Sequence, residues 1–294
     1  MKIRFDMSNS ADWLKRFSEF LNPERMKYAW LIGGAIWFAW FVNISLGTGN
    51  YDLAGQPLGG DYVDFHAAGV TINRGETDRL YDFDYQRLLQ FDILGGEFNS
   101  SDAYNALITP PHYSFPFIFL SRFSYRVSFI LWSLIGLVFV FASILLTKID
   151  HPKRVFIWSL SYFPVFAAIS FGQNSLLSLG LFSLTYYFWD RKSDNLDTDL
   201  FLSGLFASFL LYKPQIVLGI VLLWLFNFKR DWRALVSLGF GGLIQAGLSF
   251  WLMPKASIDY FYLAKSVLPS LLQESGYPIW HSYNLRAFWL LLLP

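Results

Sequence analysis

Three side chains that could do chemistry lie close together between residues 59 and 69, in the sequence GGDYVDFHAAG. The carboxylates of Asp61 and Asp64 are three residues apart, so they would share a face if this stretch is helical. A carboxylate there could take the proton from a hydroxyl nucleophile. Two neighbouring carboxylates could instead hold a divalent cation, for which the imidazole of His66 is a poorer ligand. The third alternative is that these three side chains are ordinary solvated loop residues without a function.

The rest of the chain is strongly apolar. Of its 294 residues, 54% are hydrophobic and only 15% are charged, and the apolar residues form long runs between short charged connections. This distribution is typical of a polytopic helical membrane protein. The net charge of +1 gives no indication of nucleic acid as a partner. The absence of cysteine excludes disulfides, thiolate metal sites and a cysteine nucleophile.

The apolar runs predict about seven membrane spans. Residues 1–27 are polar and basic with apolar side chains at helical spacing, which indicates a cytoplasmic interfacial segment. Residues 28–294 would form a single membrane domain, with a first span at 28–46 that is retained because it lacks the features of a signal peptide. The final stretch after residue 284 resembles half of another span, so we expect a truncated last one. The other runs are 127–146, 155–171, 175–189, 200–212, 216–228 and 235–253.

The connection after the first span is unusually long. Basic residues concentrate in the connections on the same side as the N-terminus, so the positive-inside rule places that end in the cytoplasm and residues 47–126 outside. The first part of this loop, 47–106, carries ten acidic residues against three arginines. A loop of this length is more often functional than idle. Segments 65–74 and 85–94 could form short surface helices, whereas 113–120 is apolar but too short to cross.

Two pairs of the predicted spans are short and are joined by polar turns at 172–174 and 213–215. A span needs about 20 residues to cross a hydrocarbon core of about 30 Å, but these four runs have roughly 13 to 17. Their turns could therefore lie below the membrane surface, where irregular backbone is tolerated only in protein or beside a cavity. Interrupted segments of this kind indicate a binding site.

Lys213 would need a partner at such a depth. An anionic lipid phosphate is one candidate; the alternatives are snorkelling to the headgroups or pairing with an outer-loop carboxylate. Gln173 and Asn174 could contact a substrate or could simply cap and turn a helix. His281 lies among aromatic residues that could stack on a sugar or belong to an interfacial belt.

An ordered series of short motifs runs over about residues 55–250. The motifs are Asp61-Tyr62, Phe65, Ala67-Ala68-Gly69, Gly75, Leu80-Tyr81-Asp82, Pro110-Pro111, Pro116, Trp132, Gly172-Gln173-Asn174 and Lys213-Pro214-Gln215. This series resembles glycosyltransferase family 87, which contains polytopic enzymes of the GT-C class, typified by polyprenol-phosphate-mannose-dependent mannosyltransferases. The resemblance implies an all-α polytopic transmembrane helical bundle of GT-C type with a long first extracytoplasmic loop.

The resemblance also implies an activity. A hexosyltransferase would move a sugar, with mannose as the first expectation, from a polyprenyl-phosphate donor to a hydroxyl of a glycolipid or glycan acceptor. The reaction would occur in the lipid bilayer, on the outer face of a bacterial-type cell (inner) membrane. No cofactor is predicted; Asp61 and Asp64 permit a divalent cation without requiring one.

One residue role follows from the same resemblance. The position that matches the general base of the class is Asp61. The charge on the departing phosphate needs stabilisation, and the chemistry of the residues themselves, not the resemblance, suggests that Lys213 could supply it with Arg122 or Arg126 as helpers. The full set of predicted substrate-binding residues is Asp64, His66, Arg122, Arg126, Gln173, Asn174, Lys213, Gln215 and His281.

Two other classes of function fit these residues. A membrane transporter or lipid carrier with a deep anion site at Lys213 would explain the two polar turns, but it gives no role to the acidic outer loop. A non-catalytic scaffold whose outer loop binds a partner predicts that Asp61 can be changed without consequence.

Overall fold

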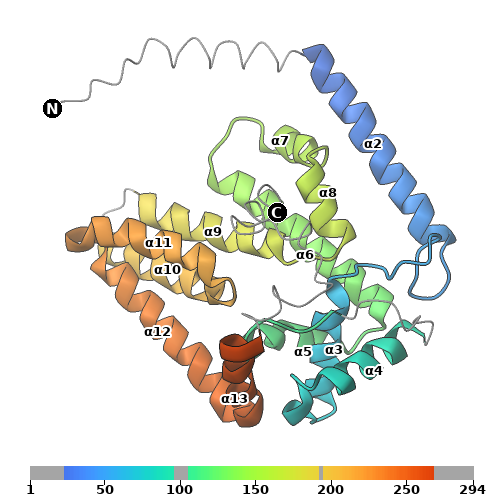
Figure 1. Ribbon diagram of the computed structural model, residues 1–294. Helices are drawn as coiled ribbons and strands as arrows, with labels where there is room; N and C mark the ends of the chain where they lie inside the picture. Colours follow the sequence, from blue (N-terminus) through green and yellow to red (C-terminus); the bar gives the residue numbers. More distant parts are fainter. Residues whose placement is uncertain (1–22, 96–104, 192–194, 268–294) are drawn as a thin grey trace, which may run out of the picture. The chain divides into compact units, whose positions relative to one another are not determined.

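The computed structural model describes residues 23–95, 105–191 and 195–267 (Figure 1). The regular elements in these ranges are all helices, which confirms the all-α prediction. The chain divides into two compact units, each built from two segments of sequence. The first contains Met1–Tyr62 and Phe129–Leu184, and the second contains Val63–Ser128 and Thr185–Pro294. The predicted site residue His281 lies outside the described residues.

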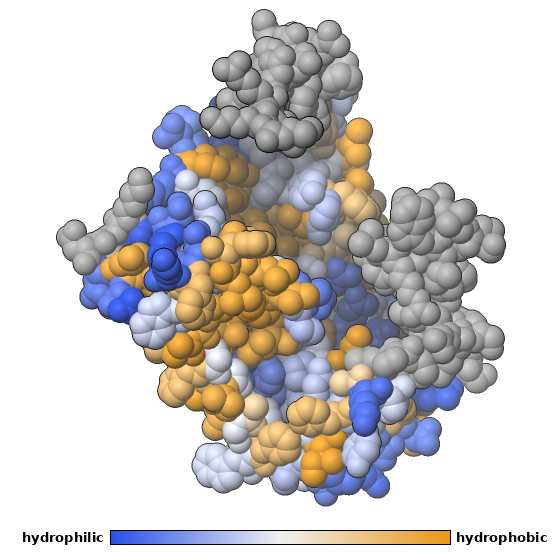
Figure 2. Space-filling view, turned by 60° about the vertical axis from the view of Figure 1, so that its left-hand side comes forward, coloured by the Kyte–Doolittle hydropathy of each residue, from blue (hydrophilic) through white to orange (hydrophobic). Residues whose placement is uncertain are grey.

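Three of the described helices are long and apolar enough to cross a membrane. They are α2 (Pro23–Leu46), α6 (Tyr125–Leu146) and α12 (Phe228–Leu252). Large apolar side chains on them are exposed, for example Phe38 at 71% and Leu243 at 74%. Figure 2 shows hydrophobic residues spread over a broad part of the visible face. Water would disfavour such a surface and lipid would accommodate it, so the chain is an integral membrane protein.

The first unit packs its helices around an apolar core. It contains α2, most of α6, α7 (Pro152–Ser159), α8 (Phe163–Ser170) and the first part of α9 (Ser175–Asp190). Tryptophans of α2 close the core, with Trp37 and Trp40 both edge-on to Phe166 of α8. The buried core residues are Val140, Val165, Ala168, Ile169 and Leu176.

The run at 155–171 forms two helices instead of the continuous span that its composition predicts. Helix α7 ends at Ser159, and α8 begins at Phe163 with Pro164 in its first turn. Proline has no backbone N–H to donate to the carbonyl four residues earlier, here that of Leu160, and its ring clashes with that carbonyl, so one helix cannot continue through Pro164. The break leaves the carbonyl of Leu160 available, and the indole N–H of Trp37 donates to it at 2.7 Å.

The second unit begins with the outer-loop segment. The predicted helices at 65–74 and 85–94 are present as α3 (Tyr62–Asn73) and α4 (Phe83–Leu94). Helix α3 is not a surface helix, because nearly every side chain from Tyr62 to Thr71 is buried. A Cβ on Gly69 would lie 2.2 Å from the carbonyl oxygen of Phe117, so this glycine permits close contact with α5 (Phe115–Leu120).

The remainder of the second unit is built on the pair α10 (Leu196–Ser208) and α12. Small residues let the two backbones touch, because a Cβ on Gly204 would lie 2.1 Å from the carbonyl oxygen of Ala234. The Ser237 hydroxyl donates to the Phe201 carbonyl at 2.6 Å across the same seam. Small and polar residues thus face inward and apolar ones outward, the usual arrangement of packed membrane helices. The other elements are η1 (Thr77–Arg79), η2 (Pro111–Ser114), η3 (Phe209–Tyr212), α11 (Pro214–Phe226), α13 (Pro254–Tyr262) and the short π-helical turn η4 (Leu263–Val267).

Candidate active site

Asp61 lies in the first unit, immediately before the first residue of α3. Its backbone N–H donates to the carbonyl of Phe171 at 2.9 Å, and its carboxylate accepts a hydrogen bond from the side-chain amide of Gln173. The hydroxyl of Ser175 contacts Gln173 Oε1 at 3.4 Å, which leaves the NH2 group of that amide for Asp61. Asp61 and Gln173, which were predicted separately as site residues in distant segments, are therefore in direct contact.

The turn that carries Gln173 has a constrained backbone. Gly172 joins α8 to α9 with φ of +68°, a left-handed conformation that favours glycine. A Cβ at this position would lie 2.6 Å from Cβ of Tyr62, the residue that follows Asp61. The absence of a side chain at Gly172 thus allows the turn and the start of α3 to pack together.

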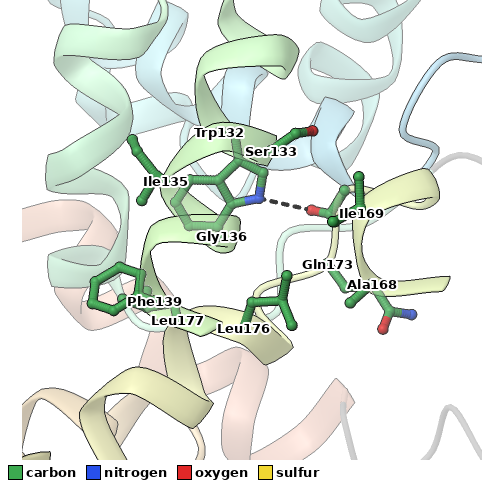
Figure 3. Close-up of a pocket in the computed structure, with 11 residues that line it drawn as sticks. Trp132, Ser133, Ile135, Gly136, Phe139, Ala168, Ile169, Gln173, Leu176 and Leu177 are labelled. Carbon is green, nitrogen blue, oxygen red and sulfur yellow. Dashed lines mark hydrogen bonds between the residues drawn. The ribbon is translucent and has the colours of Figure 1, made fainter. Parts of the chain in front are cut away.

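Trp132 of α6 connects the two parts of this site. Its indole N–H donates to the carbonyl of Gly172 at 3.0 Å. The dashed line from Trp132 in Figure 3 marks this hydrogen bond. Its ring stacks on Tyr62 with a centroid separation of 6.1 Å and an interplanar angle of 25°. Sequence reasoning gave Trp132 and Tyr62 no role in the site, although both belong to the motif series that resembles the family.

The environment of Asp61 suits a base. Burial raises its pKa above the ordinary value for an aspartate, because a carboxylate loses solvation there, and the Gln173 hydrogen bond lowers its pKa in part. A higher pKa makes the carboxylate a stronger proton acceptor once it is ionised. The Gln173 contact favours that ionised form.

A small pocket borders this site between α6, α8 and α9 (Figure 3). Trp132 and Gln173 line it together with apolar residues such as Phe139 and Leu176. Its volume of about 10 Å³ is roughly that needed by one water molecule. A sugar ring therefore does not fit in this pocket.

The other two residues of the opening motif lie in the second unit. Asp64 is buried, and its Oδ1 accepts from the backbone N–H of Phe65 at 2.9 Å. His66 is also buried, with Nδ1 at 3.1 Å from the Ser128 hydroxyl and its ring edge-on to Tyr125. The part of the chain that the structure describes contains no group of three His, Asp or Glu side chains placed to hold a metal ion. The substrate contacts proposed for Asp64 and His66 stay predictions.

Acid should destabilise the fold through His66. Burial lowers its pKa to about 4, below the 6.5 of an exposed histidine. As the pH falls from about 6.5 towards 4, the unfolded chain takes up a proton that the folded chain does not, so the free energy of unfolding decreases. At 1.36 kcal/mol per pKa unit the loss is about 2 to 3 kcal/mol. Burial also lowers the pKa of His112 to about 4, so this histidine adds to the loss of stability in acid.

The unfolding temperature in detergent at pH 8 and pH 5 checks this expectation. His66→Gln should reduce the difference between the two values, whereas the control His151→Gln, at an exposed position, should leave it unchanged. An undiminished difference in His66→Gln would show that other groups cause the acid sensitivity.

The proposed donor-binding residues lie on short elements of the second unit. Lys213 is half-buried at the N-cap of α11, after Tyr212, whose ring stacks on Tyr113 at 4.3 Å. Among the described residues of this unit, no acidic side chain forms an ion pair with Lys213. Gln215 is exposed in the first turn of α11. The Nζ of Lys213 lies over the ring of Tyr212, 5.9 Å from its centroid. The substrate contacts predicted for Lys213 and Gln215 stay predictions.

The remaining predicted residues are placed as follows. Arg122 is exposed and Arg126 is half-buried in the first turn of α6. Asn174 is buried in the first unit, and its carbonyl accepts from the backbone N–H of Ser178 at 3.0 Å at the start of α9. This carbonyl contact fits the helix-capping interpretation of Asn174. Its substrate contact stays a prediction, as do those of the two arginines.

Comparison with known protein families decides the class of this membrane protein. The family model for glycosyltransferase family 87 matches residues 108–289, more than half of the chain. The chain belongs to glycosyltransferase family 87. No curated protein and no solved structure matches it.

Membership of glycosyltransferase family 87 establishes a membrane glycosyltransferase, and hence a hexosyltransferase with sugar donor and acceptor substrates. The GT-C class is consistent with this assignment. The matched stretch contains Trp132, Gln173 and Lys213, whereas Asp61 precedes it. The region that matches family 87 therefore includes the turn at 172–174, to which Asp61 is hydrogen bonded.

Proposed function

We propose that the enzyme transfers mannose from a polyprenyl-phosphate donor to a hydroxyl of a glycolipid or glycan, with Asp61 as the general base. The observation that carries this proposal is the partly buried carboxylate of Asp61, held by the Gln173 amide at the start of α3. The reaction takes place on the outer face of the cell (inner) membrane, with the N-terminus in the cytoplasm. A concentration of basic residues on the opposite side supports this orientation.

The chemistry is a single displacement at the anomeric carbon. The acceptor oxygen forms a bond to C1 while its proton passes to a carboxylate oxygen of Asp61. The bond between C1 and the phosphate oxygen breaks, and its electron pair leaves with the polyprenyl phosphate, so the configuration at C1 inverts. Phosphate leaves readily without protonation, so one base suffices. Asp61 then releases its proton to solvent.

Gln173 acts on the base in this proposal. Its amide N–H favours the ionised carboxylate that the reaction requires, and its contact with Ser175 orients the amide. This role differs from the direct substrate contact that the sequence predicts for Gln173.

Lys213 is the residue proposed to bind the donor phosphate. A cation held at a developing negative charge away from bulk water stabilises a transition state strongly. Lys213 is partly shielded and, among the described residues of its unit, has no acidic partner to neutralise it. Arg122 and Arg126 are proposed as helpers.

Label transfer tests the donor class. The purified protein is reconstituted in liposomes with radiolabelled polyprenyl-phosphate-mannose and a membrane extract as acceptor, and parallel reactions contain polyprenyl-phosphate-glucose or nucleotide-activated mannose. We expect transfer from the polyprenyl-phosphate-mannose alone. Transfer from the glucose donor would change the assigned sugar, and transfer only from the nucleotide sugar would refute the donor class.

Lys213→Met should raise the KM for polyprenyl-phosphate-mannose by about 10- to 100-fold, since a hydrogen bond to a charged group is worth about 1.5 to 3 kcal/mol. The Met side chain keeps the apolar stem and removes only the charge. Lys255→Met is the matched control, because Lys255 is an exposed lysine of the same unit that pairs with Asp259. An unchanged KM in Lys213→Met would remove Lys213 from the donor site.

A further inference from the structure

We propose that Trp132 is a positioning residue that holds the peptide between Gly172 and Gln173, so that the Gln173 amide stays on the carboxylate of Asp61. This inference rests on the proposed role of Asp61 as the base. Trp132 is 6% exposed and contacts this peptide and the ring of Tyr62. Its function would be to keep the base aligned.

The peptide that joins Gly172 to Gln173 is fixed at both ends. A peptide unit is planar, so its C=O and N–H groups move together. The indole of Trp132 donates to the Gly172 carbonyl at 3.0 Å, and the Gln173 N–H donates to the Ala168 carbonyl at 2.8 Å. These two bonds set the direction in which the Gln173 side chain leaves the backbone. Figure 3 shows the indole nitrogen directed at the Gly172 oxygen.

The indole ring of Trp132 also packs against the segment that carries Asp61. It stacks on Tyr62, which is fully buried and follows Asp61 in the chain. The backbone N–H of Tyr62 donates to the Gly59 carbonyl, so a hydrogen bond closes the turn that contains Asp61. Trp132 therefore contacts both the turn that supplies the amide and the segment that supplies the carboxylate.

Loss of the indole N–H would leave the Gly172 carbonyl buried without this donor. A buried carbonyl that loses its partner carries a desolvation penalty, and rotation of the peptide relieves it. That rotation would turn the Gln173 amide away from Asp61. Burial raises the pKa of Asp61 and the Gln173 amide lowers it in part, so loss of the amide contact raises this pKa further. The acidic limb of the pH–activity profile should therefore move.

The test compares four proteins: wild type, Trp132→Phe, Gln173→Met and the double variant. Gln173→Met removes the donor to Asp61 and should move the acidic limb of kcat/KM to higher pH by roughly half a unit to one unit. Trp132→Phe keeps a ring against Tyr62 but removes the N–H, and it should move the limb in the same direction. Because both changes act through one contact, the double variant should move it no further than Gln173→Met alone.

Trp37→Phe is the matched control. The Trp37 indole also donates to a backbone carbonyl in the first unit, that of Leu160 at 2.7 Å, but far along the chain from the turn at 172–174. This variant should lower the unfolding temperature and leave the pH profile unchanged. If Trp132→Phe does not fold, benzothienylalanine at position 132 keeps the shape of the indole and lacks only its N–H.

A second readout does not depend on activity. Dicyclohexylcarbodiimide modifies protonated carboxyl groups, so its labelling of Asp61 against pH, followed by peptide mass spectrometry, reports the titration of this residue directly. The labelling midpoint should shift upward in Trp132→Phe and in Gln173→Met. A profile of Trp132→Phe that coincides with wild type, or a shift that adds to that of Gln173→Met, would overturn the inference. Full transfer by Asp61→Asn, together with a shifted labelling midpoint of Asp61 in Trp132→Phe, would instead refute the proposed base and leave the positioning contact intact.

Discussion

Asp61→Asn should lower kcat for sugar transfer by about 10²- to 10⁴-fold, the usual contribution of a general base. Asparagine has nearly the same shape as aspartate and can still accept a hydrogen bond from Gln173 through its side-chain oxygen. It cannot take a proton from the acceptor hydroxyl. Donor binding should persist, because the change removes a group needed only in the transition state.

Label transfer from polyprenyl-phosphate-mannose, with donor binding measured in parallel, checks this result. Asp52→Asn is a suitable control, since Asp52 lies on the same loop of the first unit and accepts from Asn43 Nδ2 at 2.7 Å and from the Gln56 N–H at 2.8 Å. That variant should lose stability and keep its transfer rate per folded molecule. Equal transfer by Asp61→Asn and wild type would remove Asp61 from the mechanism and favour a non-catalytic role for the outer loop.

Gly172→Ala should reduce transfer at least tenfold and also lower the unfolding temperature. The left-handed backbone costs an L-residue about 1 to 2 kcal/mol. In addition, the new Cβ would lie 2.6 Å from Cβ of Tyr62, an atom fixed close to the backbone that cannot rotate away. The turn or the start of α3 must therefore shift, which separates the Gln173 amide from Asp61.

Gly75→Ala separates backbone strain from this steric clash. Gly75 has a similar φ of +74°, but a Cβ there meets nothing within 4 Å. Its variant should lose about 1 kcal/mol of stability from strain alone and should transfer sugar normally. Thermal unfolding and label transfer are measured for both variants. Equal behaviour of the two would mean that close packing of Gly172 against Tyr62 is unimportant for catalysis.

Length and apolar composition were sufficient to predict the long helices. The first span was placed at 28–46 and the last described one at 235–253, and the structure has α2 and α12 over these residues. A proline overrode the same pattern at 155–171. Pro164 can be seen in the sequence. Whether a helix breaks at such a proline depends on tertiary contacts that supply hydrogen bonds to the freed backbone carbonyl, here the contact from the Trp37 indole.

Burial within the outer loop was harder to predict. Helix α3 was expected on the surface because the loop is acidic and follows a span. Most of the acidic residues of the loop lie outside this helix. After Asp64 the helix contains Ala67, Ala68 and Gly69, and these small residues allow close packing. Composition averaged over a long loop conceals such a local pattern.

Only part of the candidate site could be selected from the sequence, because Trp132 and Tyr62 were given no role and none of the contacts was predicted. Asp61 and Gln173 were both selected from the sequence, yet neither spacing nor polarity indicates that they touch. The contact depends on the left-handed turn at Gly172 and on the indole of Trp132. Such pairings follow from tertiary packing between distant segments, which a single sequence does not encode in any local signal.

The seam between α10 and α12 has a consequence for handling the enzyme. Backbones that touch through Gly204 and Ala234 are held by close packing and by hydrogen bonds such as that from Ser237, not by exclusion of water. Replacement of lipid by detergent changes what covers the outer face of α12 and leaves these contacts untouched. This helix pair should therefore survive extraction as a unit, which makes it a sound place for attaching a spectroscopic probe or a crystallisation partner.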